Sequence, residues 1–185
     1  MATTTTTPAS TITWNLDPAH SQVDFKVKHM MISNVKGTFH GLTGTLIQDP
    51  ANPNRCHVEA TVDISTIDTG DPQRDAHLKS ADFFEHETHP VMTFKSTRVE
   101  KKGEEEYLVT GDLTMHGITK QITFHVEGPS APAKDPWGNT RIGLSATARI
   151  NRKEFDLNWN AALETGGILV GEDVQITLDA QFIRA

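Results

Sequence analysis

Histidines are the residues of this chain whose type first suggests chemistry, because an imidazole can bind a metal or carry a proton. There are nine of them, and the densest group is His86 and His89, with His77 upstream. A zinc-protease motif needs two histidines four residues apart on one helical face. Here they are three residues apart and Pro90 follows at once, so a continuing helix is not expected. The sequence therefore predicts loop histidines and no metal site.

The neighbours His20 and Ser21 are a second candidate, since a histidine base can activate a serine nucleophile. Adjacent side chains on a strand point to opposite faces, which prevents such a pairing. No Gly-x-Ser-x-Gly sequence accompanies them. We expect His20 instead to hold the turn at Asp17 and Pro18 through a hydrogen bond.

Strict alternation of apolar and charged residues identifies the elements that position these side chains. In the segment that leads away from Ser21, Val23, Phe25 and Val27 point one way while the charged residues between them point the other. One face of this strand therefore meets an apolar interior and the other meets water. The same period recurs in the runs 57–65, 107–115, 142–150 and 174–182, with shorter runs at 35–47, 91–99 and 118–126.

Turn-forming residues separate these runs. Proline and glycine interrupt the pattern at 49–54, 101–104, 128–139 and 165–167. Many short strands with such turns predict an all-β fold, a sandwich or a barrel, and a closed barrel leaves no unpaired edge. Glycines inside strands also need a geometric reason. We expect them to form either kinks at barrel corners or simple bulges, at Gly37, Gly41, Gly44 and Gly111.

One stretch departs from the strand period and predicts a short helix near 72–80. Asp71 is a good N-cap residue, and Pro72 suits the first helical position. The adjacent Phe83 and Phe84 follow on the connection back to the sheet. At least one of the two is expected to be buried and to close one end of the barrel.

Length and composition exclude several classes of protein. The 185 residues suffice for one domain with a substantial core. A formal net charge of −7 does not fit a nucleic-acid surface, which needs clustered lysine and arginine. Cys56 is the only cysteine, so an internal disulfide and a Cys-x-x-Cys site are excluded.

The first residues, MATTTTTPAS, lack the basic start and the apolar stretch of a secretory signal. No run approaches the roughly 18 apolar residues that span a bilayer. We interpret residues 1–11 as a disordered polar tail and residues 12–185 as the folded domain. A cytoplasmic protein that is not embedded in a membrane is expected.

Several ordered motifs together resemble the YceI-like, polyisoprenoid-binding family over about residues 13–182. The resemblance implies a lipocalin-like extended antiparallel β-barrel whose elongated apolar cavity holds an isoprenoid or a related lipid. The chain differs from the family pattern at 154–157 and 171–174, where the changes are conservative, and in its missing export signal. The matching pieces are WNLDPAHSQVDFKVKHMMISNVKGTF, HLKSADFFE, PVMTF, GDLTMHGITKQI, DPWGNTRIG and GGILVGEDVQITL.

The leading hypothesis is a non-enzymatic protein that binds, carries or sequesters a long apolar ligand: a polyisoprenoid, an isoprenoid quinone or a fatty-acid-like lipid. His29 shares the parity of Phe25 and Val27, so it could meet a ligand head group at the cavity mouth; an exposed histidine is the alternative. The candidate ligand-binding residues are Phe25, Val27, His29, Phe39, Leu78, Phe83, Phe84, Met92, Phe94, Leu113, Met115, Phe155 and Trp159.

Two alternatives stay open. The first is an isomerase or hydrolase that uses the same cavity through His29, His116 or Asp75, which would require an acid and a base to converge there. The second is a packed structural or interaction barrel without a ligand. No cofactor is expected. The frequency of two-fold dimers and the family resemblance suggest a homodimer.

Overall fold

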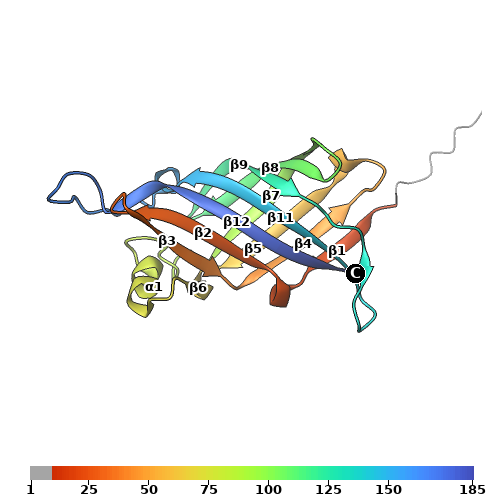
Figure 1. The fold of residues 1–185 in the computed structure, drawn as a ribbon, viewed down its shortest axis with the longest axis horizontal. Helices are drawn as coiled ribbons and strands as arrows, with labels where there is room; N and C mark the ends of the chain where they lie inside the picture. The colour runs from red at the N-terminus through yellow and green to blue at the C-terminus, as the bar shows by residue number, and fades with distance from the viewer. Residues whose placement is uncertain (1–9) are drawn as a thin grey trace, which may run out of the picture.

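The computed structural model describes residues 10–185, so the predicted tail lies outside the described residues except for its last two positions. Strands dominate the fold (Figure 1). They are β1 (Ile12–Leu16), β2 (Gln22–His29), β3 (Ser33–Phe39), β4 (Leu42–Gln48), β5 (His57–Asp63), β6 (Ile67–Asp68), β7 (Val91–Lys101), β8 (Glu106–Met115), β9 (Ile118–Glu127), β10 (Ala133–Lys134), β11 (Thr140–Asn151) and β12 (Val170–Arg184).

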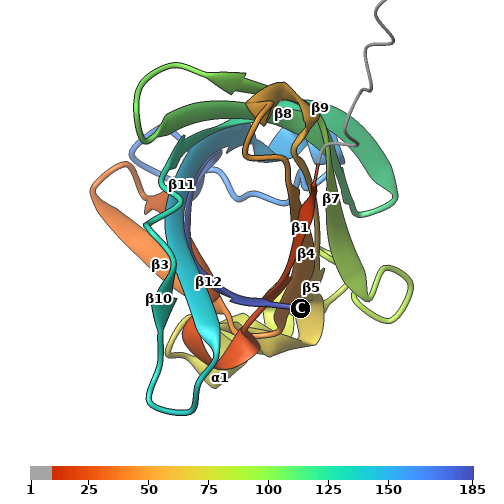
Figure 2. The same ribbon diagram turned by 90° about the vertical axis from the view of Figure 1, so that its right-hand side faces the viewer.

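Eight of these strands close into an antiparallel barrel. Each pairs with the next in the order β11-β9-β8-β7-β5-β4-β1-β12, and β12 pairs with β11 to complete the ring. Figure 2, which looks along the long axis, shows the strands encircling that axis. The pair β2–β3 continues the wall beyond β1 because the long strand β12 pairs first with β2 and then with β1. The predicted lipocalin-like extended barrel is confirmed.

The alternation read from the sequence corresponds to the two faces of the wall. Phe25 and Val27 of β2 lie directly opposite Ile176 and Val174 of β12, so apolar residues face one another across the strand pair. Paired residues of antiparallel strands share a face, and each such pair reinforces the register. The inner face therefore carries an almost continuous apolar surface.

Two predicted runs are each divided in the structure. The run 35–47 forms the separate strands β3 and β4, which are divided at His40 and Gly41 and pair with different neighbours in the sheet. The run 57–65 leaves the sheet after Asp63, whose carboxylate accepts a hydrogen bond from the Ser65 amide and begins the 3-10 turn η3 (Ile64–Thr66). A short side chain that bonds a nearby amide competes with the sheet in this way.

Two glycines have a clear geometric reason. Gly111 lies opposite Ser96, where the register of β7 against β8 shifts, and a Cβ there would come within 2.3 Å of the Lys95 carbonyl oxygen. A Cβ on Gly44 would lie 2.5 Å from the Glu59 carbonyl oxygen. Both positions allow neighbouring backbones to approach closely, and Gly111 does so at a bulge.

The predicted helix is present as α1 (Pro72–Lys79). The Asp71 carboxylate accepts hydrogen bonds from the amides of Gln73 and Arg74 at 2.9 and 3.3 Å, which satisfies two free donors of the first turn. In the described part of the chain, no helix combines the length and apolar character needed to cross a membrane.

An arginine links the turn before β11 to the turn after β1, at the barrel end that holds the C-terminus. Arg141 of β11 donates from Nη1 to Asp17 Oδ2 at 2.6 Å and from Nε to Asp135 Oδ2 at 2.7 Å. As predicted, His20 also bonds Asp17, with 2.8 Å between Nδ1 and Oδ2. Hydrogen bonds from Arg141 first, and then from His20, lower the pKa of Asp17 to about 2. Arg141 likewise lowers the pKa of Asp135 to about 2.

Candidate functional site: an apolar cavity along the barrel

A cavity of about 590 Å³ occupies the barrel interior. Both Met92 and Lys101, near the two ends of β7, line it. The nine residue-to-residue steps from Met92 to Lys101 extend over about 30 Å at a rise of about 3.3 Å per residue. The volume lies within the range of small-molecule sites, roughly 300–1,000 Å³. The cavity is therefore long and narrow.

The side chains that line the cavity come mainly from the inward-facing positions of the strands. On β8, Tyr107, Val109, Leu113 and Met115 face the cavity, as the alternation predicts. Of the thirteen residues predicted to bind a ligand, eleven line this cavity: Phe25, Val27, Phe39, Leu78, Phe83, Phe84, Met92, Phe94, Leu113, Met115 and Trp159. Their contact with a ligand stays a prediction.

The other two predicted residues, His29 and Phe155, are not among the lining residues described. His29 ends β2, where the register against β12 shifts between Val170 and Val174. The extra residues of this shift lie in β12, whereas β2 keeps a regular register with β3 up to the pair of His29 and Ser33. Phe155 belongs to the 3-10 turn η4 (Arg152–Phe155) and is fully buried in the core beside the cavity. Whether these two side chains contact a ligand stays a prediction.

Aromatic rings form a row on one wall. The ring centroids of Phe25 and Phe39 lie 5.5 Å apart, and those of Phe39 and Phe84 lie 5.9 Å apart in an edge-to-face arrangement. Phe84 reaches this row from the connection after α1, so the connection contributes to the cavity wall. Rings at these separations attract one another beyond the area they bury.

A second aromatic cluster lies at the α1 end of the barrel. His77 of α1 packs edge-to-face on both Phe83 and Trp159, with centroid distances of 5.1 and 4.7 Å. Phe83 and Trp159 are 5.4 Å apart. All three residues line the cavity, and Phe83 is buried. This cluster, with Phe84 beside it, forms the wall at the α1 end, where the sequence predicted a phenylalanine.

Arg152 is a buried charged residue that the sequence analysis missed. Its side chain lines the cavity and donates to the carbonyls of Gly171 at 2.7 Å, Leu157 at 2.5 Å and Trp159 at 3.0 Å. Burial lowers the pKa of Arg152. The signal for its position was available, because residue 152 continues the inward parity of Ile150 on β11.

At the opposite end, a few polar groups meet the cavity. Asp49, Cys56 and His57 are among its lining residues. The Asp49 side chain is buried, and its Oδ1 accepts hydrogen bonds from the amides of Ala51 and Asn52, both at 3.1 Å. Burial raises the pKa of the Cys56 thiol. These groups shape the turn that ends β4 and offer polarity only at the cavity margin.

The residues proposed for an enzymatic alternative do not converge. Among the described residues, the cavity lining includes neither His29 nor His116 nor Asp75. Asp75 instead accepts hydrogen bonds from the amide and hydroxyl of Thr69, at 2.9 and 2.5 Å, and so anchors α1 to β6. An acid and a base that act on one substrate must both reach it.

The fold and the cavity define a lipocalin-like β-barrel with an apolar interior. The chain belongs to the YceI-like domain family, whose model matches residues 14–182. A UPF0312 protein of Staphylococcus aureus is 38% identical over 170 residues, which cover 91% of this chain and 96% of that protein. A UPF0312 protein of Staphylococcus epidermidis matches with the same identity and coverage.

Solved structures share the fold. BcnA of Burkholderia cenocepacia superposes with a TM-score of 0.76 at 25% identity, covering 90% of this chain and 98% of that one. The YceI protein of Campylobacter jejuni superposes with a TM-score of 0.71 at 30% identity, covering 85% of this chain and 90% of that one. A polyisoprenoid-binding domain of Saccharophagus degradans superposes with a TM-score of 0.67 at 18% identity, covering 94% of this chain and 99% of that one. At this identity the likeness shows the fold alone.

Proposed function

We propose that this protein binds a long apolar ligand, without chemical conversion, and carries or sequesters it inside the barrel. The candidates are a polyisoprenoid, an isoprenoid quinone or a fatty-acid-like lipid. The observation that carries this proposal is the cavity, which is lined by apolar side chains from Met92 to Val99 of β7 and from Val174 to Phe182 of β12.

Energetics favour a chain-like ligand over a compact polar one. Each methylene moved from water into an apolar site contributes about 0.8 kcal/mol. A ligand of ten or more carbons would then need few polar contacts for useful affinity. The scarcity of polar groups along the middle of the cavity fits this mode of binding, whereas a small polar substrate would leave its own hydrogen-bonding groups unpaired.

Relatives support the proposal at the level of the family. The Saccharophagus degradans domain is described as polyisoprenoid-binding, and its barrel has the same fold. At 18% identity, the choice of ligand here rests on the cavity lining of this chain rather than on that domain. The long, continuous cavity also argues against a barrel packed solid with side chains.

Native mass spectrometry of the purified full chain tests the proposal. We expect a mass increment from a co-purifying lipid, and organic extraction should release a molecule with a long hydrocarbon chain. The extracted protein should then bind a long-chain isoprenol or fatty acid in a titration. A chain that carries no lipid and binds neither probe would overturn the carrier function.

A further inference from the structure

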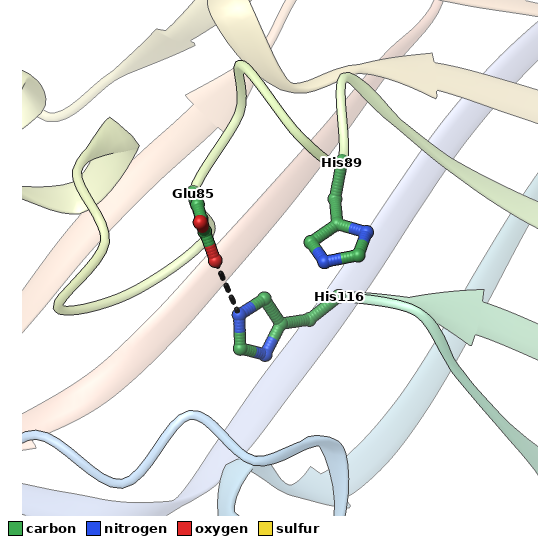
Figure 3. Close-up of side chains that lie close together, drawn as sticks. All are labelled: Glu85, His89 and His116. Atoms are coloured by element: carbon green, nitrogen blue, oxygen red, sulfur yellow. Dashed lines mark ion pairs between the residues drawn. The ribbon is translucent and has the colours of Figure 1, made fainter.

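We propose that Glu85, His89 and His116 form a binding site for a divalent transition-metal ion of the zinc type. One donor atom from each of the three side chains lies within 4.8 Å of the other two. Figure 3 shows them converging from two loops, the connection after α1 and the turn between β8 and β9. The site lies outside the cavity lining, and the inference does not depend on lipid binding.

Glu85 and His89 are placed together by a single turn. The Glu85 carbonyl accepts hydrogen bonds from the amides of Thr88 at 3.0 Å and His89 at 2.9 Å, and the Glu85 amide donates to Ser80 at 2.8 Å. An i to i+4 bond of this kind forms an isolated α-turn. One carboxylate oxygen of Glu85 accepts a bond from the Thr88 hydroxyl, and the other is turned toward His116.

His116 is held by the hairpin that joins β8 to β9. Both residues of this two-residue turn, His116 and Gly117, have positive φ, at 54° and 75°, as a type I′ turn requires. A Cβ on Gly117 would lie 2.9 Å from Cε1 of His89, so the His89 ring lies directly over this glycine. The two histidine rings are 5.1 Å apart. The turn therefore brings together the two loops that carry the donors.

The hydrogen bond of His116 leaves the correct atom free for a metal. Its Nδ1 is 3.0 Å from the Phe155 carbonyl oxygen, which can only accept, so Nδ1 carries the proton. In the neutral ring, Nε2 then presents a lone pair toward Glu85. A ring nitrogen that donates to a carbonyl while the other binds the ion is the usual arrangement around metal-bound histidines. The His116 side chain is only 11% exposed, which limits its motion.

The separation of the donors suits an ion better than a hydrogen bond. His116 Nε2 and Glu85 Oε2 are 3.9 Å apart, beyond hydrogen-bonding distance. Two zinc–ligand bonds of about 2.0–2.1 Å reach across at most about 4.2 Å, and tetrahedral ligand atoms lie about 3.3 Å apart. The Glu85 side chain is 42% exposed and free to close the remaining gap.

The donor set selects the class of ion. Imidazole nitrogen suits zinc, copper, nickel and iron, whereas calcium and magnesium prefer oxygen ligands alone. Two histidines and one carboxylate leave one position of a tetrahedral ion for water. Because Phe84 lines the cavity next to Glu85, a bound ion would also fasten the connection after α1 to the barrel.

Zinc titration of the chelator-treated full chain, followed by calorimetry, tests the site. We expect about one Zn²⁺ per chain, as three protein ligands predict. His116→Asn, chosen because asparagine suits a type I′ turn, and His89→Gln should each weaken binding by more than about tenfold. His40→Gln, at a 59% exposed histidine outside the site, is the matched control and should bind zinc like the parent.

A second measurement separates a specific site from surface binding. Hydrogen exchange of the amides in 80–90 should slow when Zn²⁺ is added to the parent and to His40→Gln, but not to His116→Asn or His89→Gln. Circular dichroism confirms that each variant is folded. No zinc binding by the parent, or equal binding by all three variants, would overturn the proposal.

Discussion

The ring of Phe25 occupies the space where Gly37, its direct partner on the neighbouring strand, has no side chain. A Cβ on Gly37 would lie 2.3 Å from Cζ and 2.5 Å from Cε1 of Phe25. Such distances are far inside van der Waals contact. The glycine therefore leaves room for the ring of Phe25 in the aromatic row of Phe25, Phe39 and Phe84.

Replacing this glycine is expected to move the ring into the cavity. Gly37→Ala should force Phe25 off its position, cost about 1–3 kcal/mol as overpacked cores do, and shorten the longest lipid retained. Chemical denaturation and mass spectrometry of extracted lipid measure the two effects. Gly143→Ala is the control, because the nearest atom to its Cβ would be 3.7 Å away. Unchanged lipid length in Gly37→Ala would contradict this role for Gly37.

Filling the middle of the cavity tests where the ligand lies. Leu113 faces inward on β8 and is 7% exposed. Leu113→Trp adds apolar volume without a charge, so the protein should fold but retain shorter chains, or bind long ones at least about tenfold more weakly. Leu108→Trp is the control. It makes the same change at an outward-facing position of β8, at a residue that does not line the cavity. If both variants retain the same lipid as the parent, the ligand lies elsewhere.

Arg152 is expected to be a major contributor to stability at the α1 end. Arg152→Met preserves much of the apolar stem but removes all hydrogen-bond donors. Each buried carbonyl that is left unpaired should cost about 1–3 kcal/mol of stability. The free energy of unfolding should fall by at least the cost of one such carbonyl. Lys153→Met is the control, since Lys153 makes a half-exposed ion pair with Glu172. A loss no larger than that of the control would contradict the assigned role.

The Arg141 network predicts a dependence of stability on pH. The pKa values of Asp17 and Asp135 are lowered from 3.8 to about 2, so their contribution is present above the unfolded value. It is lost as the pH falls from 3.8 toward 2. Arg141→Met should therefore lower the midpoint of thermal unfolding at pH 7, and its difference from the parent should shrink as the pH falls through about 2.

Thermal unfolding followed by circular dichroism across this pH range measures the effect. Arg98→Met, at an arginine whose side chain is 65% exposed, is the control and should show little change at any pH. A difference between Arg141→Met and the parent that persists undiminished at pH 2 would show that another interaction of Arg141 stabilises the fold.

Period-two alternation predicted an all-β sandwich or barrel and most of the inward-facing residues, and the family resemblance implied the lipocalin-like barrel. Leu113, Met92 and Val27 line the cavity because side-chain direction in a regular strand is a local property, decided by position along the strand. The helix α1 could also be predicted from local sequence, because Asp71 and Pro72 supply the capping geometry within a few residues. His29, the last residue of β2, is not among the lining residues although β2 keeps its register with β3 up to that position, so alternation alone does not decide which side chains reach the cavity at a strand end.

Contacts between distant segments depend on how the strands close. The spacing of His86 and His89 matches no metal motif. The structure instead brings His89 close to Glu85, four residues before it, and to His116 in the turn between β8 and β9. Arg152 likewise acquires its carbonyl partners only when η4 folds against the start of β12. The sequence by itself determined which residues point inward, because parity is local. Only the tertiary structure decided which of them meet, because closing the ring joins β11 to β12 and brings separate loops to one barrel end.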